Sequence, residues 1–433
     1  MSEATTAPHP LLGTFAYRTL LAAFALFVVV SWMPRLTTVG DDIGIGAVLL
    51  AIMAALMLFA PKRARLDPQA EGCRLAILLG AGFLLFWGYL GVFGLDNPFR
   101  AGRLILSVGQ GVILVFVISQ VLSVRALRLA LALAGAGLVA TSLLSLYNYL
   151  GGSPTSLTIL IPGHDRSSGL FKNPNQYGMV VAMGMPFAVA LYFRHGSRAL
   201  ALLLGVAVLI GLVLAGSKTN LMIGTLLLLV STSYMLLASG RGRTLLVALP
   251  FMIFVTLLGG MPLLELFNPR AAAILTDLVV GSGAGENVTV AQRLDMWSHS
   301  LEEVRHSPLF GQGTGQRIDT TAQVHSHSHN MFVDLARTTG IPGVAGALLF
   351  VLSSCWLAAR TLLRLARLPA HFLLAPSSGS PLVAAACLAL FSYVLSNQMS
   401  DSFGPSTSVF FWLCVGLVLR RDDLLHADRT GVR

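Results

Sequence analysis

Long apolar runs dominate the sequence and set the tightest limit on what the chain can fold into. Twelve runs can be distinguished, and they begin near Leu20, Ile43, Leu75, Leu104, Leu127, Pro174, Ala199, Asn220, Thr244, Ile341, Leu382 and Val409. A helix needs roughly 20 apolar residues to cross the hydrocarbon core of a bilayer. The runs therefore predict an all-α integral membrane protein with about twelve transmembrane helices.

Composition excludes several other classes of protein. Hydrophobic residues make up 55% of the 433 residues and charged residues only 11%, whereas a soluble domain carries about 25% charged residues. So few charges could not cover a water-soluble fold of this size. A cytosolic enzyme, a disordered regulator and a secreted disulfide scaffold are excluded.

The net charge of +10 has a topological explanation. In a soluble protein this excess would suggest a nucleic-acid partner. Here most lysine and arginine residues fall in alternate segments between the apolar runs, on the side where the N-terminus would lie. Because cytoplasmic loops of membrane proteins are enriched in these residues, we expect both termini to be cytoplasmic and expect no nucleic-acid partner.

The segments between the runs are mostly short, with one long exception on the external side. We expect residues 1–259 to form nine transmembrane helices with short loops and residues 260–340 to form a large external loop that contains helices. Residues 341–433 should form three more transmembrane helices and a cytoplasmic tail. A loop this long usually carries function.

The first polar stretch of the large loop has the pattern of an amphipathic helix. Apolar residues recur at helical spacing at Leu294, Trp297, Leu301 and Val304, which predicts a helix with an apolar face. Pro308 and the glycines at positions 311, 313 and 315 should end it in a turn. No strand precedes these glycines, so we interpret them as a turn and not as a phosphate-binding loop.

The second polar stretch contains three alternating histidines, His325, His327 and His329, followed by Asn330. Such a group could bind a metal, one histidine could exchange a proton, or the segment could be a solvated loop with no chemistry. The spacing alone leaves these three possibilities open. A helix should follow, ended by Gly340 and Pro342.

Few cations lie on the external side, and two stand beside tight turns. Lys218 lies between two apolar runs, where a charge is costly unless it is paired, functional or able to reach the interface. Arg166 precedes a segment in which Asn173 and Pro174 could simply cap a helix. External cations near a histidine would also suit a diphosphate leaving group and a base.

These residues resemble the O-antigen ligase and polymerase superfamily of bacterial envelopes. Its motif has His, then Asn, Ser or Gln, nine residues, Gly, two residues, then Gly, Thr or Tyr, and it matches here from His329 to Gly343. Weaker matches lie around Arg166, at the turn of Ser217 and Lys218, and from Arg293 to Gly313. The resemblance covers about residues 166–343.

The resemblance implies a GT-C-like glycosyltransferase of the bacterial inner (cytoplasmic) membrane, with its active site and large loop facing the periplasm. The donor would be a glycan on undecaprenyl diphosphate, and the acceptor a sugar hydroxyl of lipid A–core. His329 would be the general base of an inverting, metal-independent reaction that needs no cofactor. The implied diphosphate-binding residues are Arg166, Lys218 and Arg293, and the implied supporting residues are Asn330, His327, Arg337 and Trp297. The family usually has arginine where this chain has Lys218, which loses bidentate phosphate binding.

Other activities remain compatible with the same pattern. An O-antigen polymerase and a protein O-oligosaccharyltransferase would share the donor and differ in the acceptor. A transporter of lipid-linked sugars would also have many spans, but it should concentrate its charges near mid-membrane. Here the charges gather in external loops and at the ends of spans. This distribution favours an enzyme. Among the enzymes we expect a ligase, because a single loop near the C-terminal third dominates, whereas polymerases usually have two substantial loops.

Overall fold

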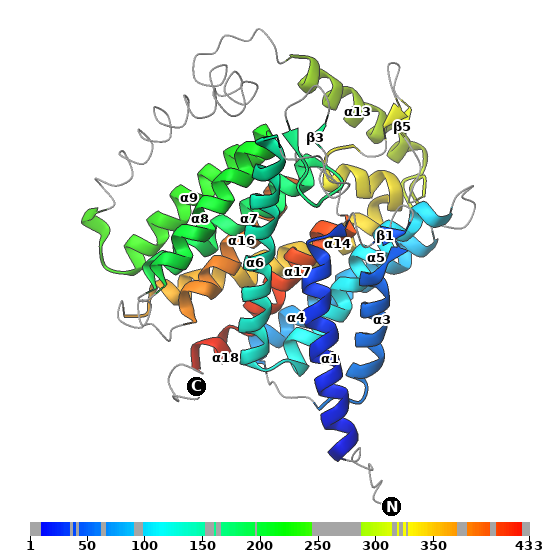
Figure 1. Cartoon of the computed structure of the whole chain (residues 1–433). Coiled ribbons are helices and arrows are strands. Elements are labelled where there is room, and N and C mark those ends of the chain that lie inside the picture. Colours follow the sequence, from blue (N-terminus) through cyan, green and yellow to red (C-terminus); the bar gives the residue numbers. More distant parts are fainter. Residues whose placement is uncertain are drawn as a thin grey trace, which may run out of the picture.

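The computed structural model describes the chain in fourteen stretches. They are residues 10–34, 38–39, 43–61, 66–90, 98–151, 160–161, 166–194, 197–244, 287–313, 318–319, 324–325, 328–369, 379–398 and 404–426. Within them the protein is a helical bundle with three small hairpins (Figure 1). Apart from its first residue, the run expected from Thr244 lies outside the described residues, as does the whole segment 260–286.

The described helices follow one another in a simple order. They are α1 (Pro10–Ser31), α3 (Ile45–Met57), α4 (Pro68–Leu90), α5 (Pro98–Phe116), the π-helical turn η1 (Val117–Val121), α6 (Val124–Tyr149), α7 (Pro174–Phe193), α8 (Arg198–Ala215), α9 (Lys218–Ala238), α13 (Asn287–His306), α14 (Met331–Ala366), α16 (Ser380–Asn397), α17 (Pro405–Leu419) and α18 (Arg421–His426). Three antiparallel strand pairs accompany them. These are β1 (Thr38–Val39) with β2 (Ile43–Gly44), β3 (Leu160–Ile161) with β4 (Arg166–Ser167), and β5 (Ile318–Asp319) with β6 (Val324–His325).

The apolar runs form the transmembrane helices. Among the described residues, nine helices are long and apolar enough to cross a bilayer, and two shorter apolar helices, Ile45–Met57 and Thr407–Leu419, accompany them. Each coincides with a run expected from the sequence. The chain is an all-α integral membrane protein with many spans.

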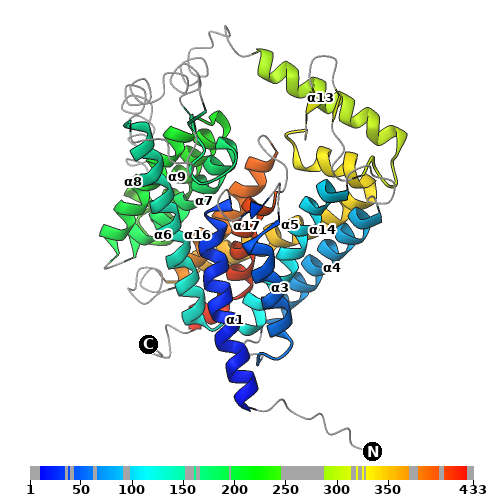
Figure 2. The same ribbon diagram turned by 45° about the vertical axis from the view of Figure 1, so that its right-hand side comes forward.

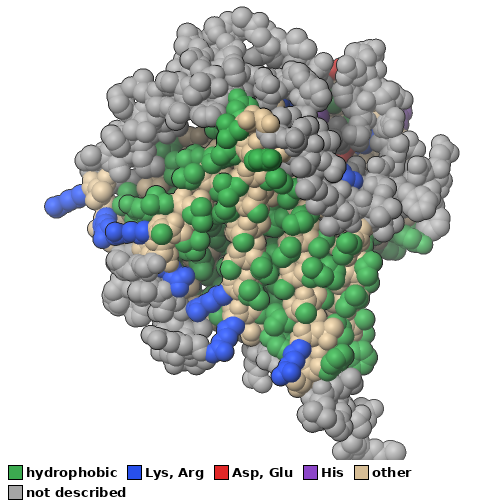
Figure 3. Space-filling model, in the orientation of Figure 1, with side chains coloured by type: hydrophobic (Ala, Val, Ile, Leu, Met, Phe, Trp, Pro, Cys, Tyr) green, Lys and Arg blue, Asp and Glu red, His purple; other side chains and the backbone are tan. Residues whose placement is uncertain are grey.

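Two helices form the centre of the bundle, and others face outward. α7 and α16 pack against each other, and 78% of the residues in the apolar window of each are buried. Peripheral helices instead expose large side chains such as Leu79, Leu202 and Leu352. Exposed apolar surface of this extent would be unfavourable in water, and it fits lipid-facing helices (Figure 3).

α4 and α14 cross in close contact at two glycines. A Cβ added to Gly80 would lie 2.6 Å from the carbonyl oxygen of Gly346, and a Cβ on Gly346 would lie 2.8 Å from the carbonyl oxygen of Gly80. Small residues let helix backbones approach in a membrane, where packing replaces the hydrophobic effect. This crossing fixes α14 against the bundle at a point inside the membrane.

The two ends of the bundle differ. The beginning of α1 and helix α18 lie at one end, and α13 lies across the other end (Figures 1 and 2). In the face shown by Figure 3, most of the visible lysine and arginine side chains lie along the lower and left rim, toward the end with α18.

Buried ion pairs join the helices at the α18 end. The Arg421 guanidinium is almost fully buried and donates to Asp67 at 3.1 and 3.2 Å, to Gln69 at 2.9 Å and to Thr361 at 3.1 Å. Burial opposes ionisation of Asp67, but backbone hydrogen bonds and the Arg421 charge outweigh it and lower its pKa. The contacts join the start of α4, the end of α14 and α18.

Candidate functional site

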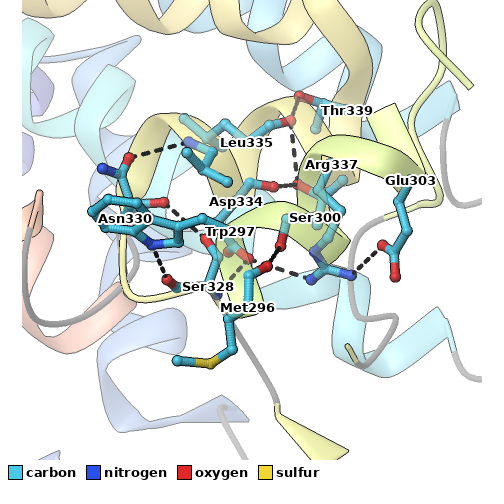
Figure 4. A network of polar contacts seen from close by, with 12 residues as sticks. Met296, Trp297, Ser300, Glu303, Ser328, Asn330, Asp334, Leu335, Arg337 and Thr339 are labelled. Atoms are coloured by element: carbon cyan, nitrogen blue, oxygen red, sulfur yellow. Dashed lines mark hydrogen bonds and ion pairs between the residues drawn. The ribbon is translucent and has the colours of Figure 1, made fainter. Parts of the chain in front are cut away.

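Helix α13 forms as predicted, and its apolar positions are not equally buried. Leu294 and Leu301 are 57% and 50% exposed, whereas Met296 and Ser300 are buried. The buried side of the helix therefore differs from the side of the two leucines. The side of α13 that meets α14 is bound by polar contacts (Figure 4), so the apolar periodicity does not report it.

The segment before α14 is held by three hydrogen bonds around Ser328. Trp297 of α13 donates its indole N–H to the Ser328 carbonyl at 2.8 Å. The Ser328 N–H donates to Asp334 Oδ1 at 3.2 Å, and its hydroxyl donates to the Asn330 carbonyl at 3.1 Å. Ser328 is fully buried, so the backbone on the N-terminal side of His329 is tightly constrained.

Asn330 constrains the other side of His329. Its side chain caps α14 and accepts the backbone N–H groups of Phe332 and Val333 at 3.0 and 3.1 Å. Such a cap satisfies amides that have no partner inside the helix. The cap sets where the helix begins relative to His329, and the supporting role expected for Asn330 stays a prediction.

His329 itself adopts a left-handed backbone conformation. Its φ is +55°, and no other described residue except glycine has a positive φ. This conformation costs roughly 1–2 kcal/mol for an L-residue, and such strain clusters at functional sites. The half-buried imidazole thus sits at the start of α14 in a conformation that its neighbours impose.

Arg337 ties α13 to α14 from inside the network (Figure 4). Its side chain is 1% exposed and lies 3.4 Å from Glu303 of α13 and 3.3 Å from Asp334 of α14. Two carboxylates therefore balance one buried guanidinium. The structure shows Arg337 buried between α13 and α14, and its supporting role in the site stays a prediction.

α14 is broken where the sequence predicts that a helix ends. Gly340 has a φ of +71°, which interrupts the helix, and a second helical segment begins directly after it. The turn after α13 fills this break. Gln312 N–H donates to the Arg337 carbonyl at 2.7 Å, and Ile341 N–H donates to the Pro308 carbonyl at 2.8 Å, so two backbone groups freed by the break are satisfied.

Arg293 differs from Arg337 in its surroundings. Its side chain is half-buried, and no hydrogen bond or ion pair joins it to another residue in the described stretches. Burial lowers the pKa of its guanidinium, although arginine remains charged at neutral pH. Arg293 precedes Trp297 by four residues on α13, about 6 Å along the helix axis, and Trp297 contacts the residue next to His329.

Arg166 belongs to a second polar cluster at the ends of α7, α8 and α9, beside the turn at which Lys218 begins α9. Arg166 Nε donates to the Ala215 carbonyl at 2.9 Å, and its Nη2 donates to Asn175 Oδ1 at 2.8 Å. Asn173 caps α7 by accepting the Asn175 N–H at 2.7 Å, as the sequence indicates. Lys218 begins α9, and its side chain lies outside the described part of the chain.

Asn220 is a member of this second cluster that the sequence reading missed. It is fully buried, and its amide donates to the Asn175 carbonyl at 2.8 Å and to Ser217 Oγ at 3.0 Å. A polar amide within an apolar run was the available signal, because a buried amide needs partners. Asn220 fixes the turn that carries Lys218 against the start of α7.

The C-terminal end of α16 links the two clusters. Asn330 donates to the Gln398 carbonyl at 3.4 Å, and the neighbouring Asn397 donates to Met179 Sδ of α7 at 3.3 Å. α13 and the hairpin of β3 and β4 also lie at the same end of the bundle (Figure 1). The described side chains among the predicted site residues therefore lie at one end of the molecule. They form two clusters, and the C-terminal end of α16 contacts the elements of both.

Two of the three motif histidines have no described side chain. The backbone of His325 pairs with Ile318 in the β5–β6 hairpin, and His327 lies outside the described residues. The prediction of a supporting role for His327 therefore stays a prediction. Among the described residues, no group of three His, Cys, Asp or Glu side chains is arranged to hold a metal ion.

A family model described as O-antigen ligase matches residues 199–351. The match covers less than half of the chain, and it supports a protein of the O-antigen ligase/polymerase superfamily. The matched region includes Lys218, Arg293 and His329, whereas Arg166 lies before it. No curated protein matches the chain.

The match narrows the class of activity. It indicates a glycosyl-transfer enzyme of the O-antigen ligase/polymerase type, acting in a membrane on a lipid-linked glycan and a lipid acceptor. An enzyme is therefore favoured over a transporter. The region it covers runs from α8 to the middle of α14 and so contains the α13–α14 network around His329.

Proposed function

We propose that this O-antigen ligase family member transfers a glycan from undecaprenyl diphosphate to a sugar hydroxyl of lipid A–core. The observation that carries the proposal is the constrained His329, whose left-handed backbone is held between Ser328 and the Asn330 cap within the family-matched region. Strain of this kind is maintained where a side chain must be aimed.

The proposed reaction is a single displacement in a GT-C-like membrane enzyme. The acceptor hydroxyl oxygen attacks the anomeric carbon of the donor glycan while the bond from that carbon to the diphosphate oxygen breaks. The imidazole of His329 accepts the hydroxyl proton, and undecaprenyl diphosphate leaves from the opposite face. Configuration at the anomeric carbon is thereby inverted, and the step as drawn is metal-independent and uses no cofactor.

The leaving diphosphate needs positive charge, and we assign this role to Arg293, Arg166 and Lys218. Arg293 is the strongest candidate because its half-buried guanidinium has no partner among the described residues. Arg166 is held in a fixed orientation by Ala215 and Asn175. Fixed cations stabilise charge as it develops on a leaving group without reorganisation at the moment of reaction.

The proposed location is the inner membrane of a bacterium, with both termini cytoplasmic and the active site facing the periplasm. The lysine and arginine side chains along the rim toward the α18 end support this orientation, because such residues favour the cytoplasmic side. α13 and His329 then lie at the periplasmic end, where a lipid diphosphate would present its glycan.

Complementation tests the proposal. Expression in a strain that lacks its ligase should restore long-chain lipopolysaccharide on a gel. His329→Ala should abolish restoration at an unchanged membrane level of protein, because a general base acts in the transition state. His306→Ala is the matched control, since this exposed histidine of the same loop lies outside the network, and it should restore normally.

The same assay distinguishes ligase from polymerase. Failure in the ligase-deficient strain, together with restored chain extension in a polymerase-deficient strain, would replace the ligase assignment by a polymerase. Full activity of His329→Ala in either strain would remove the assigned base and leave the family membership untouched.

A further inference from the structure

A ridge of apolar side chains, all but one of them exposed, joins the turn after α13 to the outward face of α4. We call it the aromatic ridge, and it consists of Phe83, Phe86, Trp87, Leu309, Phe310 and Ile341. Leu309 and Phe310 are 59% and 50% exposed although both belong to a turn between polar segments. An apolar pair at the tip of a loop, turned outward, requires an explanation.

The turn is attached firmly to α4. The rings of Trp87 and Phe310 stack with centroids 5.9 Å apart and an interplanar angle of 7°, and Phe83 stacks on Trp87 at 5.4 Å. The Trp87 indole N–H also donates to the Leu309 carbonyl. The position of Leu309 and Phe310 is therefore set by contacts with a transmembrane helix.

The ridge continues the lipid-facing surface of α4. Leu75, Leu79 and Phe83 recur every four residues and are all exposed, so they form one outward face of a transmembrane helix. Phe86 and Trp87 end this face one turn before the helix stops at Leu90. Tryptophan and other aromatic residues favour the boundary between lipid and water, which places that boundary at the ridge.

We propose that the Leu309–Phe310 turn inserts into the periplasmic leaflet of the bilayer and anchors the α13–α14 network to it. Continuity with the lipid-facing side of α4 favours lipid as the occupant over a second copy of the chain or a soluble protein. This inference is independent of the proposed reaction.

The anchor has a structural consequence for His329. The same turn fills the break in α14 through the bonds from Gln312 to Arg337 and from Ile341 to Pro308. Arg337 in turn holds Asp334 and α13. Lipid contact at the turn therefore sets the height of the whole network above the membrane.

Site-specific fluorescence tests the insertion. Bimane is attached to Phe310→Cys in the full chain after the native cysteines, Cys73, Cys355, Cys387 and Cys414, are replaced by alanine. The protein is reconstituted into phosphatidylcholine vesicles with or without a lipid that carries a nitroxide near the headgroup. Arg305→Cys is the matched control. Arg305 lies in the last turn of α13, shortly before the turn with Phe310, and its side chain is 79% exposed.

The expected result is a loss of most bimane fluorescence at position 310 with nitroxide lipid and little quenching there by aqueous iodide. Position 305 should show the reverse. Quenching by iodide at 310 equal to that at 305, with no effect of nitroxide lipid, would overturn the insertion.

A second measurement needs no variant. The wild-type chain in vesicles with a photoactivatable phosphatidylcholine should acquire label on the peptide with Leu309 and Phe310, and not on the preceding turn of α13. Label confined to α4 and α14, or crosslinks between two copies through Phe310, would also contradict the proposal.

Discussion

At the scale of single residues, the motif predicts which histidine matters, but it does not predict how the arginines divide their roles. His329 and Asn330 are adjacent, and their relation to α14 follows from local capping. The partners of Arg337 could not be inferred, because Glu303 is 34 positions away and meets it only through the packing of α13 on α14. Arg293 and Arg337 look alike in the sequence and differ sharply in the structure.

The two arginines should respond oppositely to truncation. Arg337→Ala should lower the free energy of unfolding by about 3 kcal/mol, because two carboxylates then lose a buried partner. Arg293→Ala should leave the melting temperature in detergent almost unchanged, while it weakens binding of a lipid diphosphate and lowers turnover. Equal loss of stability in both variants would contradict this division.

At the scale of elements, the break in α14 shows which features of a helix can be predicted from its own residues and which cannot. Gly340 and Pro342 correctly predict an interruption. They do not show that a helix resumes at once, because that depends on the turn from Pro308 to Gln312, which supplies the missing hydrogen bonds. The apolar pattern of α13 does not identify the side that packs on α14 for the same reason, since the two helices meet through polar contacts.

Gly340→Ala tests the fit between turn and break. Alanine has a Cβ that would overlap the carbonyl of Leu309, and it would have to adopt a φ of +71°. We expect a loss of about 2 kcal/mol or more in the free energy of unfolding, measured by thermal denaturation, with reduced transfer activity. Gly82→Ala in α4 is the control, because no atom lies within 4 Å of its added Cβ, and the change there should be small.

At the scale of the whole molecule, the transmembrane helices were largely predictable, because every segment that crosses the bilayer must satisfy its own backbone hydrogen bonds. An apolar run of sufficient length must become a helix, since its backbone groups have no other partner in lipid. The order in which helices pack was not predictable. It depends on contacts such as the crossing of Gly80 and Gly346 and the ion pairs of Arg421, which join distant parts of the chain.

Two ion pairs at the α18 end should contribute unequally to the free energy of unfolding. Asp67→Ala removes the carboxylate from the buried Arg421, so we expect a loss of about 3 kcal/mol in the free energy of unfolding. Arg364→Ala breaks the pair with Asp422, in which Arg364 is half-exposed, and should cost about 1 kcal/mol or less. Thermal denaturation of the two variants in one detergent compares them, and the reverse order would refute this assignment.

The left-handed backbone of His329 implies a trade between durability and activity at a single position. Glycine adopts this conformation without steric penalty, so His329→Gly should be more stable than His329→Ala by about 1 kcal/mol, measured by thermal denaturation, and both should be inactive. Between these two inactive variants, glycine is thus the more stable. Selection for heat resistance among variants that lack the imidazole should therefore favour glycine at position 329, whereas selection for lipopolysaccharide should restore histidine.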